Sequence, residues 1–210
     1  MRVNADAMTL YAVTDRTWVE DTTLMNQVKE ALEGGITFLQ LREKHLSKEE
    51  FIKEAREMKE LSKEYKVPFV INDNIEVALA VDADGVHIGQ DDMSVEEARK
   101  LLGEDKIIGV SAHNVEEAIK AQKGGADYLG VCATSTKKDA NVVSKEEIKK
   151  ICHTVEIPVV AIGGIKKENI KTLEGTDVDG VAVVSAIFAA KDIKKDTKQL
   201  RSLVEKMKQK

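Results

Sequence analysis

Three polar side chains alternate at the end of one apolar run of the sequence. Gln40, Arg42 and Lys44 occupy every second position from the last residues of the run 36–41 onward. Side chains of a β-strand point alternately to its two faces, so a strand here would place the amide and both cations on one side. A solvated strand exit would account for one cation. Three polar groups in register favour a site that binds an anion.

Two carboxylates, Asp73 and Asp92, each follow an apolar run, and the two runs are consecutive along the chain. Mg²⁺ takes oxygen ligands and keeps waters or substrate phosphates, so the two carboxylates could share one ion. Taken singly, either aspartate would more often be a helix N-cap. A zinc site from His87 and His113 is the weaker interpretation, because no short histidine spacing or cysteine pair supports it. His87 lies within an apolar run, where a packed, hydrogen-bonded histidine is the commoner case.

The last two apolar runs end in residues that suit a phosphate. Gly163 and Gly164 would let the backbone approach a ligand closely. Val184 and Ser185 would open a short helix whose amides face the same anion. The alternative is a glycine pair kept for tight packing. Loops after the seventh and eighth strands commonly bind phosphate in a TIM barrel, and this favours the phosphate site.

Further hydroxyl groups follow the middle runs. Ser111 ends the run 107–111 and would point to the same edge if the strand alternation holds. Thr134, Thr136 and Lys137 form a short string of hydroxyls and a cation that could bind phosphate oxygens. Together with the carboxylates, these groups indicate two phosphorylated substrates and a diphosphate leaving group. Metal and lysine would stabilise the charge that develops as diphosphate departs.

The elements that must position these residues alternate regularly. Eight apolar runs of strand length are separated by amphipathic helical segments, and most runs are apolar throughout, as parallel strands buried on both faces should be. Roughly 26 residues per unit predict an α/β fold, a single-domain (β/α)8 TIM barrel over residues 1–210. An open doubly wound sheet is the second choice, because no GxGxxG motif follows the first run. The predicted strands are 9–14, 37–41, 68–72, 85–89, 107–111, 128–131, 158–163 and 180–185.

Helix starts are marked by a capping-box spacing, in which Ser47 precedes Glu50 and Ser144 precedes Glu147 by three residues. The chain's 32 basic and 37 acidic residues give a net charge of −5, which argues against nucleic-acid and anionic-membrane partners. Two cysteines form no CxxC pair, and the sequence has no signal-peptide core and no apolar run near membrane-spanning length. We expect a cytoplasmic protein with small-molecule partners; whether it forms a homo-oligomer stays open.

An ordered set of motifs spans nearly the whole chain. The motifs are YAVTD at 11–15, QLREK at 40–44, ND at 72–73, GVHIGQ at 85–90, GVSAH at 109–113, TSTK at 134–137, IGGI at 162–165 and VSAI at 184–187. In this order they resemble the thiamine-phosphate synthase family. The resemblance implies a transferase of thiamine biosynthesis that joins 4-amino-2-methyl-5-hydroxymethylpyrimidine diphosphate to a thiazole phosphate, with Mg²⁺ as cofactor, releasing thiamine phosphate and diphosphate.

The resemblance also implies a role for each matched residue. The pyrimidine would be held by Gln40 and Ser111. Its diphosphate would be held by Arg42, Lys44, Asn72 and Lys137. Mg²⁺ would be carried by Asp73 and Asp92. The thiazole phosphate would be bound by Thr134, Thr136, Gly164, Val184 and Ser185. The expected catalytic set is Arg42, Lys44, Asn72, Ser111 and Lys137.

One segment departs from the family pattern. Between Gly130 and Thr134 the chain is three residues shorter than a pattern like GxGPxxPT, at the border of the expected pyrimidine pocket. The shorter segment predicts that the barrel is more open at the carboxyl ends of its strands, where the pyrimidine would bind. Two alternatives follow for the function: an isomerase like the thiazole tautomerase of the same fold, and a non-catalytic barrel that binds phosphate and regulates. The isomerase would need no metal, so the carboxylates and cations favour the synthase.

Overall fold

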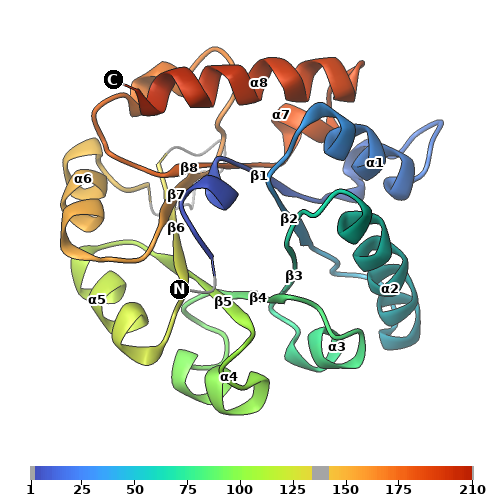
Figure 1. The fold of residues 1–210 in the computed structure, drawn as a ribbon, viewed down its shortest axis with the longest axis horizontal. Helices are drawn as coiled ribbons and strands as arrows, with labels where there is room; N and C mark the ends of the chain where they lie inside the picture. Colours follow the sequence, from blue (N-terminus) through green and yellow to red (C-terminus); the bar gives the residue numbers. More distant parts are fainter. Residues whose placement is uncertain (1–2, 134–141, 210) are drawn as a thin grey trace.

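Eight parallel strands close into a barrel in chain order (Figure 1). The computed structural model of the chain describes residues 3–133 and 142–209. Each strand pairs with the next, and β8 returns to β1 with Val181 opposite Leu10. The predicted TIM barrel is confirmed, and every predicted strand end lies within two residues of the observed one. The strands are β1 Leu10–Val13, β2 Phe38–Leu41, β3 Phe69–Asn72, β4 Gly85–Ile88, β5 Ile107–Ala112, β6 Tyr128–Cys132, β7 Val159–Ile162 and β8 Gly180–Val183.

Helices cover the outside of the barrel (Figure 1). The α-helices are α1 Leu24–Gly34, α2 Lys48–Glu64, α3 Ile75–Ala80, α4 Val95–Leu102, α5 Val115–Gly124, α6 Lys145–Thr154, α7 Ser185–Phe188 and α8 Ile193–Lys208. Short 3₁₀ helices are η1 Asp6–Met8, η2 Arg16–Trp18 and η3 Ile170–Leu173. In the part of the chain that the structure describes, no helix combines the length and apolarity needed to cross a membrane.

One predicted amphipathic helix is shorter than expected. Between β7 and β8 the chain forms only η3, whose buried residues Ile170 and Leu173 are three positions apart. Three residues per turn is the period of a 3₁₀ helix, so both side chains reach the barrel from a single turn. The helix of the eighth unit, α8, packs against both α1 and η3.

The predicted helix starts are confirmed in part. Ser47 accepts a hydrogen bond from the Glu50 amide and the Glu50 carboxylate accepts one from Ser47, which completes a capping box at α2. Ser144 accepts from the Glu147 amide at the start of α6. The Glu147 carboxylate instead accepts from the Val115 amide of the neighbouring α5, at 3.3 Å. The Glu147 side chain thus makes a tertiary contact in place of the second hydrogen bond of a capping box.

Strand alternation separates an inner core from an outer one. Tyr11 and Phe38 point into the barrel with Tyr128, and the Phe38 and Tyr128 rings lie 5.4 Å apart at their centres. Leu10 and other alternate residues point outward beneath the helices. Gly109 makes the inner packing feasible, because a Cβ atom there would lie 2.0 Å from the Tyr128 ring. The glycine within β5 therefore exists to admit a tyrosine from β6.

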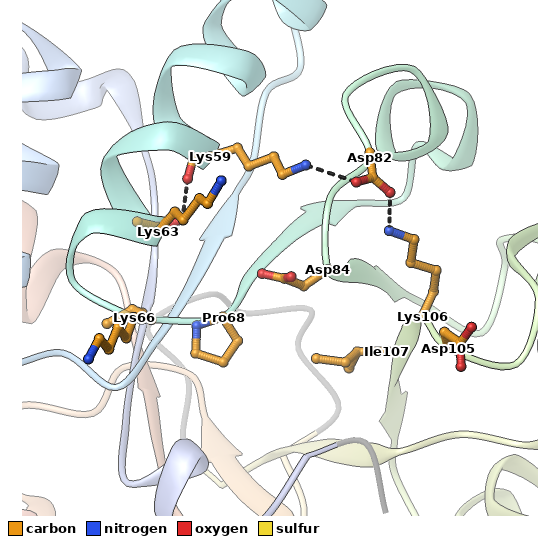
Figure 2. A pocket seen from close by; sticks show the side chains of 11 residues that line it. Lys59, Lys63, Lys66, Pro68, Asp82, Asp84, Asp105, Lys106 and Ile107 are labelled. Atoms are coloured by element: carbon orange, nitrogen blue, oxygen red, sulfur yellow. Dashed lines mark hydrogen bonds and ion pairs between the residues drawn. The ribbon is translucent and has the colours of Figure 1, made fainter.

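The amino ends of the strands carry an ion network beside a cleft of about 660 Å³ (Figure 2). Asp82, between α3 and β4, accepts from Lys59 of α2 at 3.1 Å and from Lys106, before β5, at 2.5 Å. The two lysines also donate to the carbonyl oxygens of Val81 and Ala83. The network ties α2 to the next two αβ turns. In TIM barrels this end of the strands serves stability, and the carboxyl ends serve chemistry.

We expect the Asp82 network to be visible in acid unfolding. Lys106 and Lys59 lower the pKa of Asp82 to about 2, so its contribution to stability is present above its ordinary pKa of 3.8 and lost as the pH falls through about 2. Asp82→Asn tolerates the positive φ of 53° at this position. It should lower the free energy of unfolding by about 0.5–1 kcal/mol near neutral pH, measured by urea titration. The difference from the parent chain should disappear in strong acid, and a pH-independent difference would contradict the assignment.

Candidate active site

The carboxyl ends of the strands bring the predicted site residues to one end of the barrel. Strand order makes neighbours of β2 and β3, of β3 and β4, and of β7 and β8. The predicted residues found at this end are Gln40, Arg42 and Lys44 on and after β2, Asn72 and Asp73 at β3, Asp92 after β4, Ser111 on β5, Gly164 after β7, and Val184 and Ser185 after β8. Thr134, Thr136 and Lys137 lie outside the described residues.

The exit of β2 is fixed against β1. The Thr14 amide donates to the Gln40 carbonyl at 3.0 Å, and the Thr14 hydroxyl accepts from the Arg42 amide at 3.0 Å. The Arg42 guanidinium lies 3.7 Å from the Asp15 carboxylate. These contacts continue the pairing of the strands beyond their last regular residues. Arg42 is therefore held at the edge of the barrel mouth.

A buried carboxylate anchors the same loop from behind. Glu43, which lies between the two cations in sequence, has a side chain only 3% exposed and receives Arg16 at 2.8 Å. Arg16 also contacts Glu54 of α2 at 2.5 Å. Burial, followed by the nearby Glu54 charge, raises the pKa of Glu43, while Arg16 opposes the shift. Glu43 is thus held toward α2. Strand alternation continued beyond Leu41 would place Arg42 and Lys44 on the opposite side, as the sequence predicts.

The two predicted metal ligands lie side by side. The pKa of Asp73 is raised to about 6, first by loss of water around its carboxyl group and then by the adjacent Asp92 carboxylate. Asn72 donates to Asp73 at 2.5 Å, and the Gly89 amide donates to Asp92 at 2.6 Å. The positive charge of Lys44 favours ionised Asp73. The two carboxylates thus lie together where a second negative charge is unfavourable.

The alternative roles considered for these side chains are not the observed ones. The N-caps of α3 and α4 are Asn74 and Ser94, so neither Asp73 nor Asp92 caps a helix. The weaker interpretation of the sequence is a zinc site from His87 and His113. In the structure the His113 ring bonds to the Glu117 carboxylate at 2.9 Å. Among the described residues, no group of three or more His, Cys, Asp and Glu side chains could hold a metal.

Two convergent carboxylates still fit Mg²⁺. This ion usually takes one or two carboxylates and completes its coordination with water and substrate phosphates. The raised pKa of Asp73 marks a place where a bound cation would relieve the repulsion from Asp92. The donor set therefore suits Mg²⁺ bound together with a phosphorylated substrate.

A hydrogen-bonded chain crosses the barrel interior beneath the mouth. The Gln40 amide nitrogen donates to the Tyr11 hydroxyl, which lies 2.8 Å from the Tyr128 hydroxyl. The Tyr128 hydroxyl lies 3.0 Å from His87 Nδ1, and His87 Nε2 lies 3.1 Å from Ser111 Oγ. Burial lowers the pKa of His87 to about 4, which keeps the ring neutral near pH 7. The expectation that His87 is a packed, hydrogen-bonded residue is confirmed.

Tyr11 and Tyr128, the two tyrosines of this hydrogen-bonded chain, were not identified from the sequence. The predicted strands included Tyr11 and Tyr128, and their alternation with Ala12 and Leu129 could have marked them as inward residues. The hydroxyl-to-hydroxyl contact, however, joins residues 117 positions apart. No local pattern encodes such a contact.

The glycine pair after β7 has positive φ values, a backbone conformation that glycine adopts most readily. Gly163 and Gly164 have φ values of 94° and 56°. Asn169 donates from its side chain to the Gly164 carbonyl at 2.9 Å and accepts from the Lys166 amide at 2.7 Å. These bonds fix the loop on itself. Because β7 pairs with β8, the loop follows the strand beside the one that leads into α7 at Ser185. A glycine loop and a short helix start after strands β7 and β8 are the usual elements of a TIM-barrel phosphate site.

The shorter segment borders residues that the structure does not describe. The Ala133 amide donates to the Ile162 carbonyl at 2.9 Å, and the Val143 amide donates to the Cys132 carbonyl at 2.7 Å. Both described flanks of residues 134–141 therefore meet at the end of β6. The predicted openness of the mouth depends on residues 134–141 and stays a prediction.

Comparison with known proteins agrees with this geometry. The thiamine monophosphate synthase family matches residues 10–187. Thiamine-phosphate synthase of Clostridium acetobutylicum is 50% identical over 200 residues, covering 94% of this chain and 95% of that protein. The Ruminiclostridium cellulolyticum enzyme of the same name is 52% identical over 195 residues, covering 91% of this chain and 93% of that one.

A solved structure extends the similarity to three dimensions. Thiamine phosphate pyrophosphorylase from Pyrococcus furiosus superposes with a TM-score of 0.89 at 42% identity, covering 97% of this chain and 98% of that one. The similarity includes every strand that carries a site residue. The chain therefore belongs to the thiamine monophosphate synthase family and is an enzyme of the transferase class.

Proposed function

We propose that this chain condenses 4-amino-2-methyl-5-hydroxymethylpyrimidine diphosphate with 4-methyl-5-(2-phosphooxyethyl)thiazole, giving thiamine phosphate and diphosphate by a dissociative, Mg²⁺-assisted route. The observation that carries the proposal is the pair Asp73 and Asp92 next to Lys44, at one end of a barrel of this family. A cation-binding pair beside a fixed cation suits a diphosphate group. The reaction would take place in the cytoplasm, where thiols such as Cys152 stay reduced.

The first substrate would lie across the ends of β2 to β5. Gln40 of β2 and Ser111 of β5 would hold the pyrimidine ring by hydrogen bonds from the inner side of the barrel. Arg42 and Lys44 would contact the diphosphate together with Asn72, and Lys137 would join them from outside the described residues. The anchored β2 exit supports this arrangement, because it holds Arg42 at the end of β2 before substrate arrives, and Lys44 follows two residues later.

Mg²⁺ would be held by Asp73 and Asp92 and would add positive charge against the diphosphate oxygens. The protein's own cations, Arg42 and Lys44, stabilise the charge that develops on diphosphate as its bond to the pyrimidine methylene carbon breaks. The electron pair of that bond leaves with diphosphate. The electron-rich aminopyrimidine stabilises the remaining cation until the thiazole nitrogen attacks it.

This route needs no strong base in the protein. The buried histidine beneath the site, His87, is neutral, and its ring nitrogens bond to Tyr128 and Ser111. The enzyme's contribution is to hold the two substrates in line and to exclude water from the cation. The thiazole phosphate would bind at the second anion site, with its phosphate against Gly164, Val184 and Ser185 and near Thr134 and Thr136.

The alternatives account for less of the site. A tautomerase-like isomerase would leave the carboxylate pair and the β2 cations without a role. A non-catalytic regulatory barrel is motivated by the short segment before Thr134. Neither alternative requires two adjacent carboxylates at a place where burial, and then the neighbouring Asp92 charge, raise the pKa of Asp73 to about 6.

Turnover tests the proposal directly. We expect the chain to form thiamine phosphate and diphosphate in equal amounts from the two substrates with Mg²⁺. Product formation should stop in excess chelator and return when Mg²⁺ is restored. Chromatography of both products measures it. Undiminished turnover in chelator would rule out Mg²⁺ assistance. Absence of thiamine phosphate under all conditions would favour the regulatory barrel, and isomerisation of the thiazole alone would favour the tautomerase.

The pH dependence of Mg²⁺ binding tests the carboxylate pair. Protons compete with the metal for Asp73, so affinity should rise with pH through about 6 and level off above it. Asp92→Asn should weaken Mg²⁺ binding and return the pKa of Asp73 toward its ordinary value. Asp91→Asn, one position away, is the matched control and should change neither. Calorimetric titration with inorganic diphosphate present measures the affinity; a flat pH profile would count against the site.

Gly164→Val tests the second anion site. A β-branched residue is strained at the φ of 56°, and its side chain would take the phosphate's place. Hydrogen bonds to a charged group contribute about 1.5–3 kcal/mol, so KM for the thiazole phosphate should rise about ten- to hundredfold. KM for the pyrimidine diphosphate should change little. Gly175→Val, at a φ of 77° in open space before β8, controls for strain alone. Equal effects on both substrates would contradict the assignment.

A further inference from the structure

We propose that Tyr11, Tyr128 and His87 are positioning residues that set the hydrogen-bonding direction of Gln40 and Ser111 and so select an aminopyrimidine over an oxopyrimidine. This inference rests on the proposed function, because Gln40 and Ser111 are the groups proposed to hold the pyrimidine. The three inner residues lie beneath the mouth and act through the two outer ones.

The chain of hydrogen bonds is continuous from β2 to β5. It runs from the Gln40 amide nitrogen through the Tyr11 and Tyr128 hydroxyls, 2.8 Å apart, to His87 Nδ1 at 3.0 Å. It ends at Ser111 Oγ, 3.1 Å from His87 Nε2. Tyr11, Tyr128, Gln40 and His87 are all at least 91% buried, so water does not compete along most of its length.

Each hydroxyl passes the direction of donation to the next group. Gln40 donates to Tyr11, which leaves the Tyr11 hydrogen for Tyr128 and the Tyr128 hydrogen for His87 Nδ1. A neutral imidazole that accepts at Nδ1 carries its hydrogen on Nε2 and donates from there to Ser111. The Ser111 hydroxyl hydrogen is then left to point away from the chain.

The two ends of the chain therefore differ in character. Gln40 has committed an amide hydrogen to Tyr11, which turns its carbonyl oxygen outward as an acceptor. Ser111 has accepted from His87 and is left as a donor. An aminopyrimidine has an amino donor and ring-nitrogen acceptors, which complement this pair. An oxopyrimidine replaces the amino donor with a carbonyl acceptor and a ring nitrogen with an N–H donor, so it opposes the pair.

The neutral state of His87 is part of the device. A protonated ring would donate from both nitrogens and would break the chain at Tyr128. The His87 ring is 8% exposed, and its two nitrogens contact the neutral hydroxyl groups of Tyr128 and Ser111. Burying a charge without an opposite charge in contact is costly, so this surrounding favours the neutral ring. Sites built to hydrogen-bond a substrate reject an unmatched analogue strongly, because buried polar groups would lose their partners.

Removing single hydroxyls tests the proposal. Tyr128→Phe breaks the chain at its centre and keeps the ring that packs on Phe38. Tyr11→Phe releases Gln40 directly, and the double variant breaks the same chain twice. Tyr65→Phe removes the third tyrosine hydroxyl of the sequence, at the end of α2 and outside the barrel, and is the matched control. Urea unfolding checks that every variant is folded.

Selectivity is the first measurement. The ratio of kcat/KM for the 4-amino substrate to that for its 4-oxo analogue should be on the order of 10⁴ in the parent chain. Either single variant should lower this ratio about tenfold or more, by freeing the Gln40 amide to turn. The double variant should lose no more than the larger single loss, since both act on one chain. An unchanged ratio in Tyr128→Phe, or an equal loss in Tyr65→Phe, would overturn the proposal.

The histidine tautomer is the second measurement, and it does not depend on turnover. Nitrogen NMR should find His87 protonated at Nε2 near neutral pH, its signal assigned by its loss in His87→Asn. Tyr128→Phe should shift the ring toward the other tautomer, while Tyr65→Phe should not. A hydrogen on Nδ1 in the parent chain would overturn the direction proposed. A parent chain without turnover would refute the proposed function, and the NMR result would then decide the chain's direction alone.

Discussion

Closure of the parallel sheet is the constraint on which the rest of this molecule depends. Every strand pairs on both sides, from β1 with β2 to β8 with β1, so no strand edge is left open. Closure also sends all carboxyl ends to one rim. Residues as distant in sequence as Gln40 and Ser185 therefore share that rim. The cations, the carboxylate pair and the glycine loop therefore lie at one end of the barrel, because strand pairing around the barrel fixes where each strand ends.

The closed barrel has an interior that side chains must fill, and here part of the filling is polar. A buried hydroxyl without a partner costs about 1–3 kcal/mol, so Tyr11 and Tyr128 are stable inside only because they bond to each other and to Gln40 and His87. Gly109 leaves the space for the Tyr128 ring. The same residues therefore fill the barrel interior and determine the polar groups beneath the candidate site.

The two ends of the barrel use charge in opposite ways. At the amino ends, Lys106 and Lys59 lower the pKa of Asp82 to about 2, which shows that these opposite charges stabilise the fold. At the carboxyl ends, burial and then the adjacent Asp92 carboxylate raise the pKa of Asp73 to about 6, which shows that a second negative charge there is unfavourable. Destabilising like charges of this kind mark functional sites, because a ligand that neutralises them recovers the cost.

The sequence alone determined the architecture, since strand and helix periods are local: apolar runs buried on both faces gave eight strands, and the motif order gave the family. It also determined which side chains, such as Arg42 and Asp73, stand at strand ends, because alternation is local too. Only the tertiary structure decided what those side chains meet. The helix after β7 shortened to one 3₁₀ turn, Glu147 turned from its own cap to α5, and Tyr11 met Tyr128. Each outcome depends on contacts between segments that are distant in the sequence, and no local spacing records such contacts.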